Sequence, residues 1–144
     1  KPLAMGVFAR QAIDMWQAPE NTELVTLFEC RAIARIDKEQ LSKVLLNLVI
    51  NSSEAMEDGG RIEVSISANE KYAILTVRDN DCGMSQEFVN KNLFRPFQTT
   101  KKHGLGIGMF QSKMIVEAHG GRITVESEAS KGTTFRVALP LEQN

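Results

Sequence analysis

The chain has 144 residues, of which 42% are hydrophobic and 24% charged, and its formal net charge is −1. These values fit one soluble globular domain over residues 1–144 and exclude disordered and fibrous classes. A net charge near zero gives no bulk attraction for nucleic acid or anionic lipid, and no apolar run approaches the ~18 residues of a membrane span.

The first third of the chain predicts two helices with two short strands between them. Apolar residues at helical spacing predict a helix over residues 3–16, ended by Pro19. Residues 24–30 and 32–36 predict short strands. Residues 37–56 predict the second helix, which Asp37 caps with the spacing of a capping box to Gln40. Its apolar stripe recurs every three or four residues: Leu41, Val44, Leu45, Leu48, Val49, Ser52 and Met56.

The remaining chain predicts strands and one long helix. Alternating apolar residues predict a β-hairpin, and later a second pair of strands. The expected segments are strands 61–67 and 72–78, a short helix 85–93, a loop 94–103, a helix 105–118, and strands 122–127 and 133–139. Paired strands separated by single helices predict an α+β fold, a two-layer α/β sandwich whose mixed, mostly antiparallel sheet has helices on one face.

Two asparagines lie one turn apart in the second predicted helix. Asn47 and Asn51 are four residues apart and therefore share a helix face. Their amide oxygens could serve Mg²⁺, a hard cation that also takes phosphate oxygens. A solvated polar face is the simpler alternative.

A polar loop that includes Asp79 and Gly83 follows directly after a predicted strand. A carboxylate at a strand end can accept a hydrogen bond from the exocyclic amine of adenine, which guanine presents elsewhere. A plain turn is the alternative, because Asp, Asn and Gly are common turn residues.

Three glycines lead into the third predicted helix. Gly104, Gly106 and Gly108 allow close backbone approach, and a helix N-terminus offers free N–H groups to an anion. Lys101, just before the glycines, could add positive charge to such an anion site. The alternative interpretation of the glycines is a flexible loop without a ligand. The spacing matches neither a Walker loop nor a dinucleotide-binding fingerprint.

In their order, these segments resemble the ATP-binding domain shared by histidine kinases, type II topoisomerases, Hsp90 chaperones and mismatch-repair clamps. Residues 45–51 resemble the N box, 79–83 and 104–108 the two glycine boxes, and 94–97 the F box. Residues 132–135 resemble the closing motif, whose threonine helps to hold adenine. The resemblance covers residues 36–140 and implies the Bergerat fold with ATP and Mg²⁺ as cofactors.

The resemblance implies a role for each matching residue. Asn51 would bind Mg²⁺, and Asn47 and Lys101 would be the catalytic residues. Asp79, Gly83 and Thr133 would hold adenine. The expected phosphate-binding residues, besides Asn47 and Lys101, are Gly104, Leu105, Gly106 and Gly108.

Position 47 distinguishes members of this superfamily. ATP-hydrolysing clamps and serine kinases commonly have a glutamate there as general base, and asparagine cannot act as one. A histidine nucleophile needs less help, because neutral imidazole already offers a lone pair. Asn47 therefore favours a histidine kinase over the alternatives of an ATPase clamp or an anti-sigma-type serine kinase.

Asp81 departs from the family pattern, because a glycine usually occupies its position. We expect it to weaken ATP binding, and it leaves a degenerate, nucleotide-free interaction module as an alternative. Neither His103 nor His119 has the context of a phosphoacceptor, and His119 is expected to cap a helix.

The chain is thus expected to be inactive alone in autophosphorylation and to serve a histidine on the dimerisation domain of its parent. The resemblance further implies a homodimeric parent, a downstream response regulator, no nucleic acid, and a cytoplasmic position, either free or at the inner membrane.

Overall fold

The computed structural model describes residues 2–28, 31–55, 59–80, 107–128 and 132–142. Its elements in chain order are β1 (Pro2–Ala4), α1 (Met5–Ile13), β2 (Thr22–Leu27), β3 (Ile33–Arg35), α2 (Lys38–Ala55), β4 (Gly60–Ala68), β5 (Tyr72–Asp79), α4 (Ile107–Ala118), β6 (Arg122–Glu128) and β7 (Gly132–Pro140). None of the helices in these described segments is long and apolar enough to cross a membrane.

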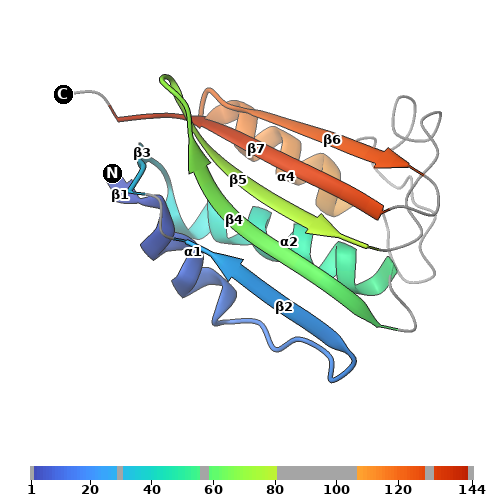
Figure 1. The fold of residues 1–144 in the computed structure, drawn as a ribbon. Helices are drawn as coiled ribbons and strands as arrows, with labels where there is room; N and C mark the ends of the chain where they lie inside the picture. The colour runs from blue at the N-terminus through green and yellow to red at the C-terminus, as the bar shows by residue number, and fades with distance from the viewer. Residues whose placement is uncertain (1, 29–30, 56–58, 81–106, 129–131, 143–144) are drawn as a thin grey trace.

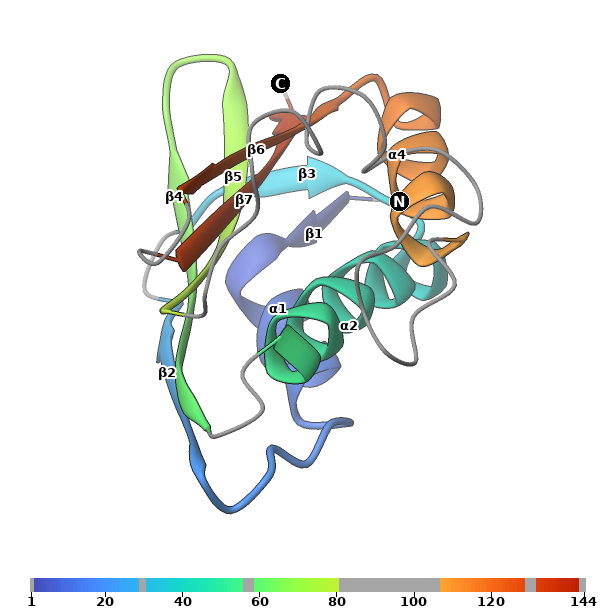
Figure 2. The same ribbon diagram turned by 90° about the vertical axis from the view of Figure 1, so that its right-hand side faces the viewer.

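Five strands form the main sheet in the order β2-β4-β5-β7-β6. β2 pairs with β4 in parallel, and the other neighbours pair antiparallel. The helices α1, α2 and α4 lie on one face of this sheet (Figures 1 and 2). The predicted two-layer sandwich with a mixed, mostly antiparallel sheet is therefore confirmed.

α2 forms where its local signals place it. The Asp37 carboxylate accepts a hydrogen bond from the Gln40 N–H at 3.1 Å, which caps the first turn. The predicted stripe faces the core, and its members from Leu41 to Ser52 are all buried. The sequence therefore predicted both the start of this helix and its buried face.

The N-terminal helix is shorter than the 3–16 predicted. Pro2–Ala4 instead form β1, which pairs antiparallel with β3, and the Met5 N–H donates to the Ala32 carbonyl at 2.8 Å. α1 ends at Ile13, before Trp16. The apolar periodicity extended beyond the helix because flanking apolar residues such as Leu3 also pack against the core.

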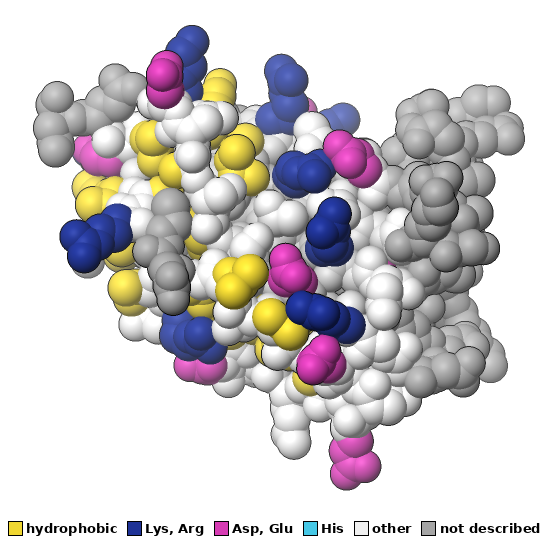
Figure 3. Space-filling view, viewed as in Figure 1, with side chains coloured by type: hydrophobic (Ala, Val, Ile, Leu, Met, Phe, Trp, Pro, Cys, Tyr) yellow, Lys and Arg dark blue, Asp and Glu magenta, His cyan; other side chains and the backbone are white. Residues whose placement is uncertain are grey.

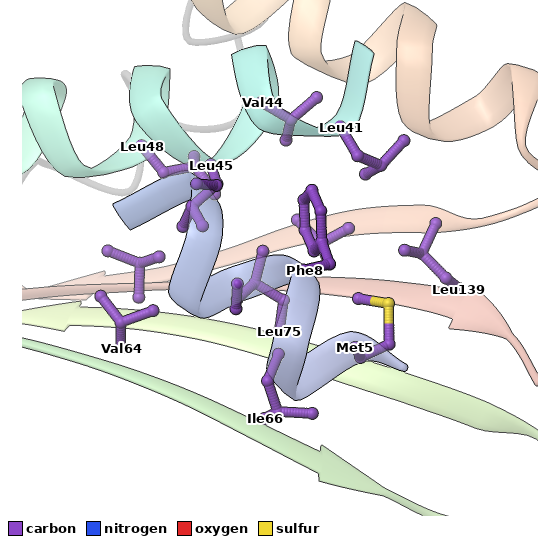
Figure 4. Packing of buried hydrophobic residues seen from close by; sticks show 14 of the residues in the cluster. Met5, Phe8, Leu41, Val44, Leu45, Leu48, Val64, Ile66, Leu75 and Leu139 are labelled. Atoms are coloured by element: carbon purple, nitrogen blue, oxygen red, sulfur yellow. The ribbon is translucent and has the colours of Figure 1, made fainter. Parts of the chain in front are cut away.

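The core lies between the helices and the main sheet. α1 contributes Met5 and Phe8 to it, and the sheet contributes residues such as Leu75 and Leu139 (Figure 4). Because a buried side chain of this size stabilises the fold by roughly 1.5–3 kcal/mol, this layer holds α1 and α2 on the sheet.

The opposite face of the main sheet carries charged side chains of both signs near its middle (Figure 3). Arg136 pairs with Glu126 across β7 and β6 at 2.9 Å, and Arg61 lies 3.7 Å from Glu23 across β4 and β2. Such exposed pairs contribute little to stability, but they keep this face polar.

The segment after β7 connects the two-stranded sheet of β1 and β3 to the main sheet. Leu141 forms a bridge with Ala34, and the Glu142 N–H donates to the Ile33 carbonyl at 2.8 Å. The Arg35 guanidinium donates two hydrogen bonds to the Glu142 carboxylate, at 2.7 and 3.1 Å. This hydrogen-bonded pairing lowers the pKa of Glu142 and raises the pKa of Arg35.

Candidate nucleotide-binding site

Asp79 is the last residue of β5, between β4 and β7. It pairs with Ile62 on one side and Thr133 on the other, and only 5% of it is exposed. The Thr133 N–H donates to Asp79 Oδ1 at 3.2 Å, and Thr133 is itself buried. The structure thus brings together two of the three residues that the sequence proposed for adenine.

The backbone around this pair is tightly fitted. Gly132 has a φ of +108°, and a Cβ there would overlap the carbonyl oxygen of Asp79 and lie 3.1 Å from Cα of Asn80. The Asn80 side-chain oxygen accepts the Arg61 N–H at 2.9 Å, which fixes the chain just beyond β5 against β4. A glycine at position 132 is therefore required for the two strands to approach at Asp79.

The two predicted amides lie on α2, and both are half-buried. Asn47 Nδ2 donates to Oγ of Ser112 on α4 at 3.4 Å, so this amide faces the neighbouring helix. Asn51 follows one turn later on the same side of α2.

α2 and α4 run antiparallel beside each other. At one end, the Asp37 N–H donates to Nε2 of His119 at 3.0 Å, and His119 Nδ1 is 2.8 Å from the Ile115 carbonyl. The Ile115 carbonyl belongs to the last turn of α4, so the predicted capping role of His119 is confirmed. Further along α2, Asn47 contacts Ser112 of α4. Positions later in α2, toward Asn51, therefore lie beside positions earlier in α4, toward its N-terminus.

One end of the molecule consequently collects the predicted site elements. The end of β5, the start of β7, the C-terminal half of α2 and the N-terminus of α4 all lie toward the right of Figure 1 and face the viewer in Figure 2. Gly108 is the second residue of α4. The other predicted residues lie outside the described segments: Gly83, Lys101, Gly104, Leu105 and Gly106.

This arrangement combines three kinds of polar group. The Asp79 carboxylate is an acceptor in an apolar setting, the asparagines offer amide oxygens suited to a hard cation, and α4 presents a helix N-terminus suited to an anion. These donor and acceptor types fit a base with an exocyclic amine and a metal-bound phosphate chain.

A family model described as histidine kinase-, DNA gyrase B-, and HSP90-like ATPase matches residues 36–143. The chain belongs to this family. Sporulation kinase E of Bacillus subtilis is 41% identical over 109 residues, which are 75% of this chain and 15% of that protein. Sensor protein FixL of Bradyrhizobium diazoefficiens is 43% identical over 107 residues, which are 72% of this chain and 21% of that protein. The resemblance to sensor histidine kinases is thereby confirmed, and the chain spans less than a quarter of either relative.

Solved structures share the fold of this histidine kinase-like ATPase domain. The mycobacterial sensor histidine kinase MprB superposes with a TM-score of 0.86 at 21% identity, covering 100% of this chain and 99% of that one. Full-length ShkA in complex with AMPPNP gives a TM-score of 0.82 at 21% identity, covering 100% of this chain and 31% of that one. The described residues of segments 2–28 and 31–35 are thus part of the same fold, although they carry no recognisable motif.

Proposed function

We propose that this histidine kinase-like ATPase domain binds Mg²⁺·ATP and donates the γ-phosphate to a histidine on a separate dimerisation domain of its parent protein. The observation that carries the proposal is the buried hydrogen bond between Asp79 and Thr133, at the end of the molecule toward which the C-terminal half of α2 with its two asparagines also runs. Membership of the family and its sensor-kinase relatives support this assignment.

In this proposal each element has one task. Asp79 accepts a hydrogen bond from the adenine amine, Thr133 supports the base beside it, and Gly83 lets the following loop pass close to the base. Asn51 holds Mg²⁺, with Asn47 supporting the contact between metal and phosphate. The phosphates are cradled by Lys101, Leu105 and the glycines at 104, 106 and 108.

Transfer to histidine requires little acid–base chemistry from this domain. The bound Mg²⁺ would neutralise charge on the phosphates, and the domain's own residues would orient the nucleotide. The Asn47 carboxamide cannot take a proton, so it holds a position and does not activate water. The same residue therefore limits futile hydrolysis and leaves the phosphate for an incoming imidazole.

The partners follow from this division of labour. The acceptor is the dimerisation domain of the same parent, which we propose to be a homodimer, and a response regulator takes the phosphate from the histidine. We place this domain in the cytoplasm, whether the parent is free or anchored at the inner membrane. We expect no nucleic-acid partner, and the described part of the sheet face in Figure 3 carries charges of both signs.

The test incubates the chain with γ-labelled ATP and Mg²⁺ and measures released phosphate and acid-labile protein phosphate. We expect nucleotide binding with neither product, and acid-labile phosphate when the full-length parent is used. Multiple-turnover hydrolysis would favour an ATPase clamp, and phosphate on an added serine substrate would favour a serine kinase. Absence of ATP binding would leave the interaction module.

A further inference from the structure

Ser112 is a fully buried serine in the middle of α4, with 0% of its surface exposed. It interrupts the apolar side formed by the buried residues Met109 and Val116, which lie one turn before and after it. A buried hydroxyl is costly without a hydrogen-bond partner, and serine is a poor helix former away from the caps. A serine at this position therefore needs a reason beyond packing.

The partner is the side chain of Asn47 on α2. Its Nδ2 lies 3.4 Å from Ser112 Oγ and donates to it. A carboxamide is planar, with a donor end and an acceptor end. A hydroxyl can accept from the amide nitrogen or donate to the amide oxygen, and in this structure it accepts from the nitrogen, so the oxygen of Asn47 points away from Ser112 toward the remaining surroundings.

That choice matters for the chemistry of the site. Only the oxygen of the amide can accept a hydrogen bond from metal-bound water or approach a cation. An amide without a fixed partner can rotate by half a turn and present its NH₂ group instead. Ser112 lies five residues beyond Ile107, where α4 begins, so the same contact links the helix of the asparagines to the helix that follows the glycines.

We propose that Ser112 is a positioning residue for Mg²⁺·ATP, acting through Asn47: it holds the Asn47 carboxamide with its oxygen turned toward the metal–phosphate region. This inference rests on the proposed function and deepens it. Residues that orient a metal-site side chain from behind typically change metal affinity by about 10- to 100-fold when they are removed.

The first measurement needs no ligand. It uses the NMR resonances of the Asn47 side-chain NH₂ group, which are assigned by their loss in Asn47→Ala. In the wild-type chain their chemical shifts should be those of a hydrogen-bonded amide. They should shift in Ser112→Ala and return in Ser112→Thr. Ser52 is also buried, and its hydroxyl has no partner among the described residues, so Ser52→Ala is a matched control that should leave these signals in place.

The second measurement is the Kd for ATP with Mg²⁺ and with excess chelator. Ser112→Ala should raise the Kd by about tenfold with Mg²⁺ and by less than about twofold without it. In an Asn47→Ala background, Ser112→Ala should add less than about twofold, because its effect passes through Asn47. Ser112→Thr should lie close to the wild type, and thermal melting confirms that each variant is folded.

The outcomes distinguish a failure of the role inferred for Ser112 from a failure of the proposed function. If the wild-type chain binds Mg²⁺·ATP but Ser112→Ala changes the Kd equally with and without the metal, or adds its full effect to Asn47→Ala, Ser112 is only a packing residue and the inference is overturned. Unmoved Asn47 signals in Ser112→Ala overturn it as well. If the wild-type chain itself shows no Mg²⁺-dependent ATP binding, the proposed function fails and this inference fails with it.

Discussion

Replacing Asp79 with asparagine separates the role of its charge from the role of its shape. The buried Oδ1 accepts the Thr133 N–H at 3.2 Å, and an asparagine oxygen can accept the same bond. The lost group is the second carboxylate oxygen, which becomes an NH₂ donor facing the donor amine of adenine. A hydrogen bond to a charged group contributes about 1.5–3 kcal/mol. At about 1.4 kcal/mol for each factor of ten, ATP binding should weaken by roughly 10- to 150-fold.

The assay is calorimetric titration of ATP and GTP into wild type, Asp79→Asn and Asp14→Asn. Asp14 is exposed at the end of α1, so its substitution removes one charge without touching the site. Asp79→Asn should lose ATP affinity while GTP loses less, because guanine presents a carbonyl where adenine has its amine. An unchanged Kd for ATP, with melting temperatures alike, would refute the adenine assignment.

Three further predictions are each tested by one substitution, and the first has a control substitution as well. Gly132→Ala forces a side chain into a φ of +108° against the end of β5 and should lower the free energy of unfolding by about 1–3 kcal/mol and weaken ATP binding. Gly120→Ala, at a φ of +75° and away from the site, should lower stability but leave the Kd unchanged, and equal losses of affinity would contradict the fit argued for position 132. Pairing with Arg35 lowers the pKa of Glu142 in the folded chain, so its stabilisation is present above the unfolded value of 4.5 and disappears as the pH falls through the folded value. Urea unfolding should therefore show Glu142→Gln less stable than wild type at pH 7 and equal to it in strong acid; a difference that persists in acid would rule out the ion pair as its cause. Asp81→Gly should tighten ATP binding, measured by the same titration, and an unchanged Kd would remove Asp81 as an obstacle to the nucleotide.

Local signals allowed much of the fold to be predicted from sequence. The Asp37 cap and the apolar spacing of α2 depend on residues three or four apart, and both were correct. β1 was missed, because a three-residue strand has almost no periodicity of its own. Its pairing with β3 joins segments about thirty residues apart, so only the folded chain shows it.

For the site, motif order predicts which residues bind the nucleotide, but it does not show how the fold holds them. The sequence identified Asp79 and Thr133, whereas their hydrogen bond depends on the register of β5 against β7. Ser112 was missed for a similar reason. Its partner, Asn47, becomes apparent only when the antiparallel packing of α2 and α4 is known.

The most direct test of the central claim is a titration of the chain with ATP, carried out with Mg²⁺ and with chelator and followed by an assay for released phosphate. The proposed function predicts saturable binding that Mg²⁺ tightens, with the nucleotide recovered intact. Absence of binding, a Kd for ATP that is the same with Mg²⁺ and with chelator, or steady hydrolysis of the ATP would contradict it.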